Sequence, residues 1–293
     1  MDFLWNNIII NPFTNMLLLI YAFIGNFGIS IILFTILLRL ATHPFMAAQI
    51  KSSTAMQALN QSDEWKKMQE KYKDDKEKMG QETMRLYQEH GINPFASCLP
   101  MLLQLPIMIG FYQSIGHAIG ETPLQLLGVV RSIYPFLEKI TSAASMAALI
   151  PIHSHFLWMD LGQPERVYIP FLSAILSGLS VPVFGIPVLA IIVGITTFLQ
   201  TKLTMPAPAP GAAAANDQSA QMTQSMSMMM PIMLFMFTIS YASGLAVYLI
   251  TSNLIGILQY AALGKVDFKS LFSKKEEAAP VKAPVKKKTA KRS

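Results

Sequence analysis

Four long stretches of this 293-residue chain contain no Asp, Glu, Lys or Arg: Phe3–Leu38, His90–Gly120, Val167–Gln200 and Gln218–Gly264. A helix that crosses a bilayer needs about 20 predominantly apolar residues. The first three stretches can each hold one such helix, and the fourth is long enough for two. Only 14% of all residues are charged, against about 25% in a soluble domain. We therefore predict an all-α integral membrane protein with five transmembrane helices.

The uncharged stretches also divide the chain into segments. We expect the five spans at 28–50, 93–116, 183–203, 226–242 and 245–264. The segments around them are expected to be an extracytoplasmic leader with an interfacial N-terminal helix (1–27), a cytoplasmic helical hairpin (51–92), an extracytoplasmic connection with interfacial helices (117–182), a disordered cytoplasmic loop (204–225) and a basic, disordered cytoplasmic tail (265–293). The interfacial helix of the leader is expected at Phe13–Ile24.

The segment Lys51–Glu89 differs from the rest of the chain because it holds eight bases and eight acids. Its apolar residues recur at spacings of three, four and seven, which indicates amphipathic helix. The Asp74-Asp75 pair is expected to separate two antiparallel helices, with Asp75 as the N-cap of the second. A solvated spacer without a partner is the alternative to a functional hairpin.

The distribution of bases predicts the orientation. The hairpin carries eight Lys and Arg and the tail carries ten, whereas the connection Ile115–Arg166 carries three. Loops rich in Lys and Arg stay in the cytoplasm. We therefore place the hairpin and the C-terminus in the cytoplasm and the N-terminus outside. No base precedes Arg39, so the leader lacks the basic start of a signal peptide and is expected to remain uncleaved.

Arg39 is the residue with the clearest functional implication. It falls inside the first predicted span, where a central Arg costs about 2.5–3.5 kcal/mol on insertion scales. The predicted spans contain no Asp or Glu, so polar side chains, backbone carbonyls or water must solvate it. The alternative is an Arg near a helix end that extends to the interface, with the helix ending at His43 or Pro44.

Other predicted spans supply polar side chains that suit such a role. If they converge on Arg39, they form a positively charged polar cavity; taken singly, each suits an interhelical hydrogen bond. These candidate groove residues are Gln104, Thr197, Gln200, Ser252 and Asn253, with Thr196 and Gln259 nearby.

Seven of the fifteen residues from Met222 to Met236 are methionine. Met is flexible and is over-used on apolar surfaces that bind varied partners. We single out Met229, Met230 and Met233 as an apolar surface for hydrophobic helices. Packing in the core or against lipid is the alternative.

Signatures of an enzyme are missing from the sequence. There is no H-E-x-x-H, G-x-S-x-G or Walker loop, and His153 and His155 lack the further ligands that a metal site needs. Cys98 is the only cysteine and has no evident base. We expect no catalysis, no cofactor and no metal.

Several motifs resemble those of the YidC/Oxa/Alb membrane protein insertases, in order and over nearly the whole chain. They are Leu38-Arg39-Leu40, the hairpin tip Tyr72-Lys73-Asp74-Asp75, Gly91-Ile92-Asn93-Pro94 through Cys98-Leu99-Pro100 and Gln104-Leu105-Pro106, Phe156-Leu157-Trp158-Met159-Asp160-Leu161, and Ser243-Gly244-Leu245-Ala246-Val247-Tyr248 with Ser252-Asn253-Leu254. The chain resembles the short bacterial five-span form. Unlike the family pattern, Gln163–Phe184 reads as an inserted segment before the third span.

The resemblance implies a groove that is open to the cytoplasm and the lipid, with Arg39 inside it and Gln104 and Gln200 at groove positions. It implies an insertase of the bacterial inner or plasma membrane whose clients are nascent membrane proteins. The ribosome is an expected partner through the basic tail and the hairpin, as are the Sec translocon, the signal recognition pathway and membrane lipids. A small-solute channel or transporter, or a lipid scramblase, would use the same polar cavity.

Overall fold

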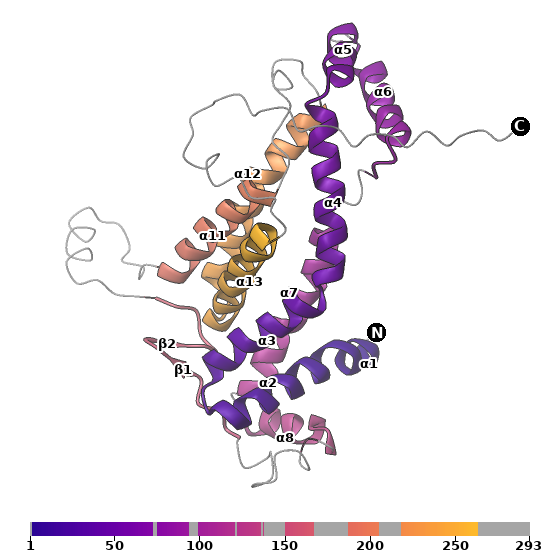
Figure 1. The fold of residues 1–293 in the computed structure, drawn as a ribbon. Helices are drawn as coiled ribbons and strands as arrows, with labels where there is room; N and C mark the ends of the chain where they lie inside the picture. Colours follow the sequence, from indigo (N-terminus) through magenta and orange to yellow (C-terminus); the bar gives the residue numbers. More distant parts are fainter. Residues whose placement is uncertain are drawn as a thin grey trace, which may run out of the picture.

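The computed structural model describes residues 2–72, 75–93, 99–120, 122–135, 137, 150–166, 187–204 and 218–262. Within these ranges the chain is mostly helical (Figure 1), in line with the predicted all-α class. The one departure is a two-stranded antiparallel hairpin of β1 (His155–Phe156) and β2 (Met159–Asp160). Expectations for 73–74, 94–98, 138–149, 167–186, 205–217 and the tail 265–293 lie outside the described residues.

The N-terminal helix is longer than the predicted Phe13–Ile24. It runs through α1 (Asp2–Trp5), the π-helical turn η1 (Asn6–Ile10) and α2 (Asn11–Ile24). It ends at Gly25, whose φ of 71° gives the left-handed cap that glycine adopts readily. In Figure 1 it crosses the direction of α4, α11 and α12 at one end of the molecule. By length and composition Phe3–Ile24 could also cross a membrane, so its interfacial position stays a prediction.

The first predicted span, 28–50, is two helices rather than one. α3 (Phe27–Ala41) and α4 (His43–Asn60) meet at a bend of 58°. The Thr42 hydroxyl donates to the carbonyls of Leu38 (2.9 Å) and Arg39 (3.3 Å), a pattern that bends helices. Proline is favoured in the first turn of a helix, and Pro44 is the second residue of α4.

Three helices from the C-terminal half lie side by side (Figure 1): α11 (Val188–Thr204), α12 (Gln218–Ser240) and α13 (Ser243–Ala262). α12 begins eight residues before the predicted 226, inside the segment 204–225 that was expected to be disordered. Residues 218–228 contain no Pro or Gly and are mostly Gln, Met, Ser and Ala, which helices tolerate. The expectation of disorder is therefore wrong for residues 218–225.

The number of spans stays a prediction. Among the described residues, Phe3–Ile24 and Ser243–Ala262 are long and apolar enough to cross a membrane, and the bent pair α3–α4 counts as a third. Val188–Leu203 and Met229–Ser240 are shorter apolar helices. The second predicted span, 93–116, corresponds to α7 (Leu99–Ile119).

Two short amphipathic helices occupy the predicted hairpin segment. α5 (Asp63–Lys71) and α6 (Lys76–Glu89) share a small core at the far end of α4 (Figure 1), in which Trp65 stacks on Tyr87 at 5.7 Å. The predicted N-cap is confirmed, because Asp75 Oδ1 accepts from Lys78 N at 3.1 Å. The cytoplasmic position of this pair stays a prediction.

A line of four aromatic rings joins the N-terminal helix to the bundle. Ring centroids lie 5.2 Å apart for Phe13 and Phe34, 5.3 Å for Phe34 and Phe111, and 4.4 Å for Phe111 and Tyr248. These residues belong to α2, α3, α7 and α13 in turn. The main hydrophobic core surrounds this line.

The connection after α7 was expected to hold interfacial helices, and only part of it does. α8 (Pro123–Ser132) is helical and begins with a capping box formed by Thr122 and Gln125. Residues 150–166 instead form the β hairpin and turns. Their carbonyls are used in tertiary contacts, since Ser243 N donates to Gln163 O (2.8 Å) and Gly244 N to Leu161 O (3.0 Å). A helix in this segment would need those carbonyls for its own ladder.

The carboxylate of Glu165 ties this connection to α11. Glu165 Oε2 accepts from Leu189 N at 2.6 Å, and Glu165 Oε1 accepts from Trp158 Nε1 at 2.8 Å. The first N–H groups of a helix lack partners within the helix. Glu165 therefore caps α11 from outside the helix.

A candidate functional site around Arg39

Arg39 lies in the last turn of α3 and is half-buried against α13. Its Nε donates to Ser252 Oγ at 2.8 Å, and Nη1 lies 4.0 Å from Met46 Sδ. Within the described part of the chain, ion pairs form only in and beside the hairpin, and none includes Arg39. The side chain is thus solvated by a hydroxyl rather than neutralised by a carboxylate.

Gln259 supports the backbone at the same point. Its Nε2 donates to Arg39 O at 3.0 Å, next to the bend between α3 and α4. Gln259 Oε1 is buried and has no hydrogen-bond partner among the described residues. One α13 side chain therefore holds the carbonyl of Arg39 while another holds its guanidinium.

Gln104 reaches the site indirectly. Its Nε2 donates to Tyr248 OH at 3.0 Å, and Tyr248 lies one turn before Ser252 on the same face of α13. The Tyr248 ring is buried against Phe111. Tyr248 lies in the motif Ser243–Tyr248 but was not predicted as a site residue, because a Tyr within an apolar run does not indicate a polar site.

Thr197 and Asn253 bond to each other. Asn253 Nδ2 donates to Thr197 Oγ1 at 2.8 Å and to Thr196 Oγ1 at 3.1 Å. Both Thr197 and Asn253 are buried. The interhelical hydrogen bond, the alternative considered for each polar residue, is thus the arrangement found between α11 and α13.

Gln200 approaches Arg39 across a glycine. A Cβ placed on Gly256 would lie 2.7 Å from Gln200 Nε2 and 3.8 Å from Arg39 Nη1. Because Gly256 has no side chain, the amide and the guanidinium can both occupy this space. The structure therefore brings Ser252 to the Arg39 guanidinium and Gln200 to the space beside it.

The three predicted methionines divide between surface and core. Met229 and Met233 on α12 are 64% and 41% exposed, whereas Met230 packs on the main core. Ile232 and Met236 are also exposed on this helix. The outer face of α12 therefore presents exposed apolar side chains, most of them the flexible side chains of methionine.

The arrangement suits the binding of a polar or acidic segment between apolar helices. The Ser252 hydroxyl orients the Arg39 guanidinium and the Gln259 amide holds the Arg39 carbonyl. The described residues contain no group of His, Cys, Asp and Glu that could hold a metal ion.

Comparisons with known proteins agree with the motifs. The profile of the 60Kd inner membrane protein family matches residues 19–269. The chain is 38% identical to the membrane protein insertase MisCA of Bacillus subtilis over 206 residues, which cover 69% of this chain and 59% of that protein. It is 36% identical to membrane protein insertase YidC 1 of Halalkalibacterium halodurans over 209 residues, or 69% of this chain and 60% of that protein.

A third relative is matched over more of both chains. Membrane protein insertase YidC 2 of Bacillus anthracis is 34% identical over 261 residues, which cover 87% of this chain and 79% of that protein. The chain thus spans about three fifths of the length of the first two relatives and 79% of the length of the third. These matches and the apolar helices show that the chain is a bacterial membrane protein. The chain belongs to the 60Kd inner membrane protein family, which is the YidC/Oxa family that its motifs resemble.

Proposed function

We propose that this chain is a membrane protein insertase that receives hydrophobic segments of nascent proteins in a polar groove around Arg39 and releases them into the bilayer. The observation that carries the proposal is the half-buried Arg39, hydrogen-bonded to Ser252 and without a carboxylate partner among the described residues. The three relatives described above, all named membrane protein insertases, support it.

The groove would lower the cost of moving a client's short polar segment into the membrane. An acidic side chain on that segment would be attracted to Arg39, and the attraction is stronger than in water because the surroundings have a lower dielectric constant. Burial of the client's own apolar helix would supply the driving force. No covalent step is involved.

The exposed methionines of α12 would guide the apolar part of the client. Met229 and Met233 present adaptable thioethers on the outer face of the helix, and such side chains adjust to helices of different shape. A client helix would move past them into lipid while its polar segment stays near Arg39.

The test compares Arg39→Ala and Arg39→Lys in liposomes that contain only the purified protein. The substrate is a single-span protein made in two forms, with and without acidic residues in its translocated segment. We expect Arg39→Ala to lose most insertion of the acidic form and Arg39→Lys to keep part of it. Lys202→Ala, which removes an exposed cation from the last turn of α11, is the control and should insert normally.

Full insertion of both substrates by Arg39→Ala would remove Arg39 from the mechanism. The same liposomes test the other uses of a polar cavity. Flux of small anions without a client would indicate a channel, and movement of labelled lipids between leaflets would indicate a scramblase.

The positive charge of the C-terminal tail leads us to propose the ribosome as a partner. Residues 265–293 hold ten bases and three acids, a net charge of +7, which suits ribosomal RNA or anionic lipid. The hairpin would receive the emerging chain, with the Sec translocon and the signal recognition pathway as further partners. Co-sedimentation with ribosomes should weaken as salt rises and after truncation at Lys265; equal binding by both forms at all salt concentrations would contradict the role of the tail.

A further inference from the structure

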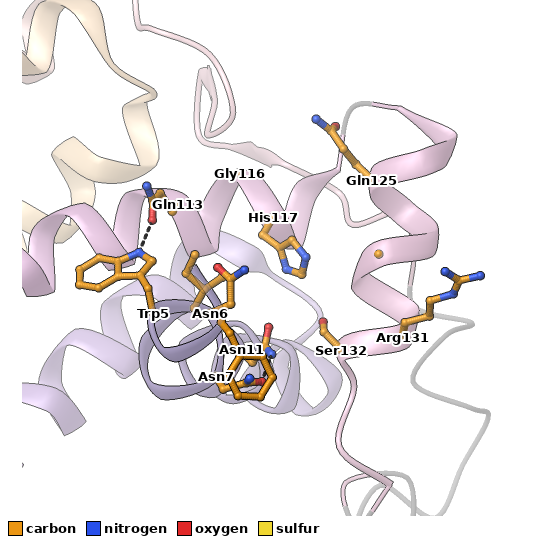
Figure 2. A pocket seen from close by; sticks show the side chains of 13 residues that line it. Trp5, Asn6, Asn7, Asn11, Gln113, Gly116, His117, Gln125, Arg131 and Ser132 are labelled. Carbon is orange, nitrogen blue, oxygen red and sulfur yellow. Dashed lines mark hydrogen bonds between the residues drawn. The ribbon is translucent and has the colours of Figure 1, made fainter. Parts of the chain in front are cut away.

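A second polar site lies away from Arg39, beside the N-terminal helix. It is a cavity of about 780 Å³. Its lining comes from α1, η1, the first residue of α2, the last turns of α7, and α8. Figure 2 shows His117 and Ser132 directed into the space beside the asparagine side chains, with Arg131 at the outer edge on α8. Its polar lining consists of Asn6, Asn7, Asn11, Gln113, His117, Gln125, Arg131 and Ser132.

The lining combines one cation, Arg131, with amide and hydroxyl groups and with the apolar side chains of Phe3, Trp5 and Ile10, and none of the described residues that form it carries a carboxylate. Arg131 is exposed and forms no ion pair with any residue that the structure describes. His117 Nδ1 is buried and lacks a hydrogen-bond partner among the described residues. A ligand with a phosphate and several hydroxyls would supply what these groups lack.

The walls of the pocket are held in place by side-chain hydrogen bonds. Trp5 Nε1 donates to Gln113 Oε1 at 2.6 Å, which joins α1 to α7. Asn15 Nδ2 donates to Ser132 O at 2.8 Å and its Oδ1 accepts from Tyr134 N at 2.8 Å, which joins α2 to the end of α8. The cavity is therefore formed before a ligand arrives.

Exposed apolar side chains lie on both helices that border the pocket. Phe3 on α1 is 78% exposed and Leu124 on α8 is 80% exposed. Leu4, Ile8 and Leu127 are exposed beside them. In a membrane protein such side chains contact lipid, so the ligand that fits is an amphiphile with a polar head in the pocket and chains along these residues.

We propose that this pocket binds a phosphatidylglycerol-type lipid, with the phosphate at Arg131 and the glycerol hydroxyls among the asparagine amides and His117. An amide offers both a donor and an acceptor, which matches a hydroxyl group. An ethanolamine head instead carries an ammonium group, which the amide carbonyls can accept but which Arg131 repels and no carboxylate among the described lining residues neutralises. Phosphatidic acid has the phosphate but lacks the hydroxyls, so it binds more weakly than phosphatidylglycerol.

The experiment is native mass spectrometry of the full-length protein in detergent, titrated with phosphatidylglycerol, phosphatidylethanolamine and phosphatidic acid of equal chain length. Gly116 lines the pocket, and a Cβ placed on it meets nothing within 4 Å. Gly116→Leu therefore adds a side chain to the cavity wall at a position where its Cβ meets no neighbour, and Gly80→Leu, at an equally open site on α6, is its control. Gly116→Leu should abolish selective phosphatidylglycerol binding, while Gly80→Leu keeps it.

The charge is tested separately. Arg131→Gln should bind phosphatidylglycerol roughly tenfold more weakly, the factor expected for one charge-assisted hydrogen bond, and Arg166→Gln, outside the pocket, should not. Unchanged binding by Gly116→Leu, or equal binding of phosphatidylethanolamine, would overturn the proposal. Displacement by free glycerol phosphate would also overturn it, because a soluble ligand lacks the chains. These readouts do not depend on insertion, so the site stands or fails apart from the proposed function.

Discussion

Gly256→Ala should separate the arrangement of the groove from the stability of the fold. The new Cβ would lie 2.7 Å from Gln200 Nε2 and 3.3 Å from Gln200 Cδ, so the amide must move by about 1 Å to reach an ordinary contact distance. The displaced group is the end of a flexible side chain, and an off-rotamer torsion costs about 0.5–1.5 kcal/mol. Replacing Gly by Ala within a helix returns about 0.8–1.0 kcal/mol. The net change in the free energy of unfolding should stay within about 1 kcal/mol.

Function should change more than stability. Gly256→Ala removes the Gln200 amide from beside Arg39, and Gly256→Leu extends toward Arg39 Nη1, which would lie 3.8 Å from the Cβ. Insertion of an acidic client in liposomes should therefore fall with Gly256→Ala and fall further with Gly256→Leu. Thermal unfolding in the same detergent gives the stability.

Gly194→Ala is the matched control. Gly194 lies on α11, and its added Cβ would lie 3.7 Å from Phe235, an ordinary van der Waals contact. It should keep both stability and insertion. Normal insertion by Gly256→Leu would refute the view that the space at Gly256 serves Arg39. A large loss of stability in Gly256→Ala would show that the Gln200 amide cannot move aside.

Three further predictions concern other parts of the chain. Hydrogen bonding to Lys78 lowers the pKa of Asp75; the ionised cap therefore stabilises α6 above the ordinary carboxyl pKa, and this contribution is lost as the pH falls through the lowered pKa. Circular dichroism should show the acid loss of helix in the parent and a smaller pH response in Asp75→Asn. Phe111→Ala should destabilise the protein by about 3–5 kcal/mol in thermal unfolding, the usual cost of such a core truncation, since Phe111 is fully buried. Glu165→Ala should cost about 0.5–2 kcal/mol, as loss of a cap does, and hydrogen exchange should rise at Leu189; unchanged exchange would argue against the cap.

Charge placement predicted the mostly helical membrane protein and singled out Arg39, whose functional role stays a prediction. A cation among uncharged residues is visible in the sequence, and lipid allows few ways to solvate it, so Ser252 and Gln200 could be proposed as its neighbours. Tyr248 gave no such signal. It is placed by its ring packing on Phe111, a contact between distant helices that no local pattern encodes.

Helix ends were harder to predict than helices. Hydropathy is continuous across Thr42, so the apolar pattern does not mark the bend. The helix end considered at His43 or Pro44 was the one signal of it, and the Thr42 hydroxyl adds a bond back to the preceding turn. Hydropathy is low before Met226, yet α12 already runs there. The sequence shows which polar residues lie in apolar helices, but it does not show which of them face Arg39. That depends on the rotation of each helix about its axis, which a single sequence does not determine. Thr197 and Asn253 bond to each other, whereas Ser252 bonds to Arg39.

The contact between Glu165 and Leu189 closes a loop in the chain. The two residues are 24 positions apart, and the 2.6 Å hydrogen bond holds the ends of the intervening segment together. The cost in entropy of closing a chain segment between two fixed ends changes only slowly with the number of residues between them, about 0.6 kcal/mol for each doubling. Residues can therefore be added or removed between the two anchors without moving α11. A member of this family can thus carry an insertion before its third span, as Gln163–Phe184 is expected to be, while the register of the helix that brings Gln200 to Arg39 stays the same.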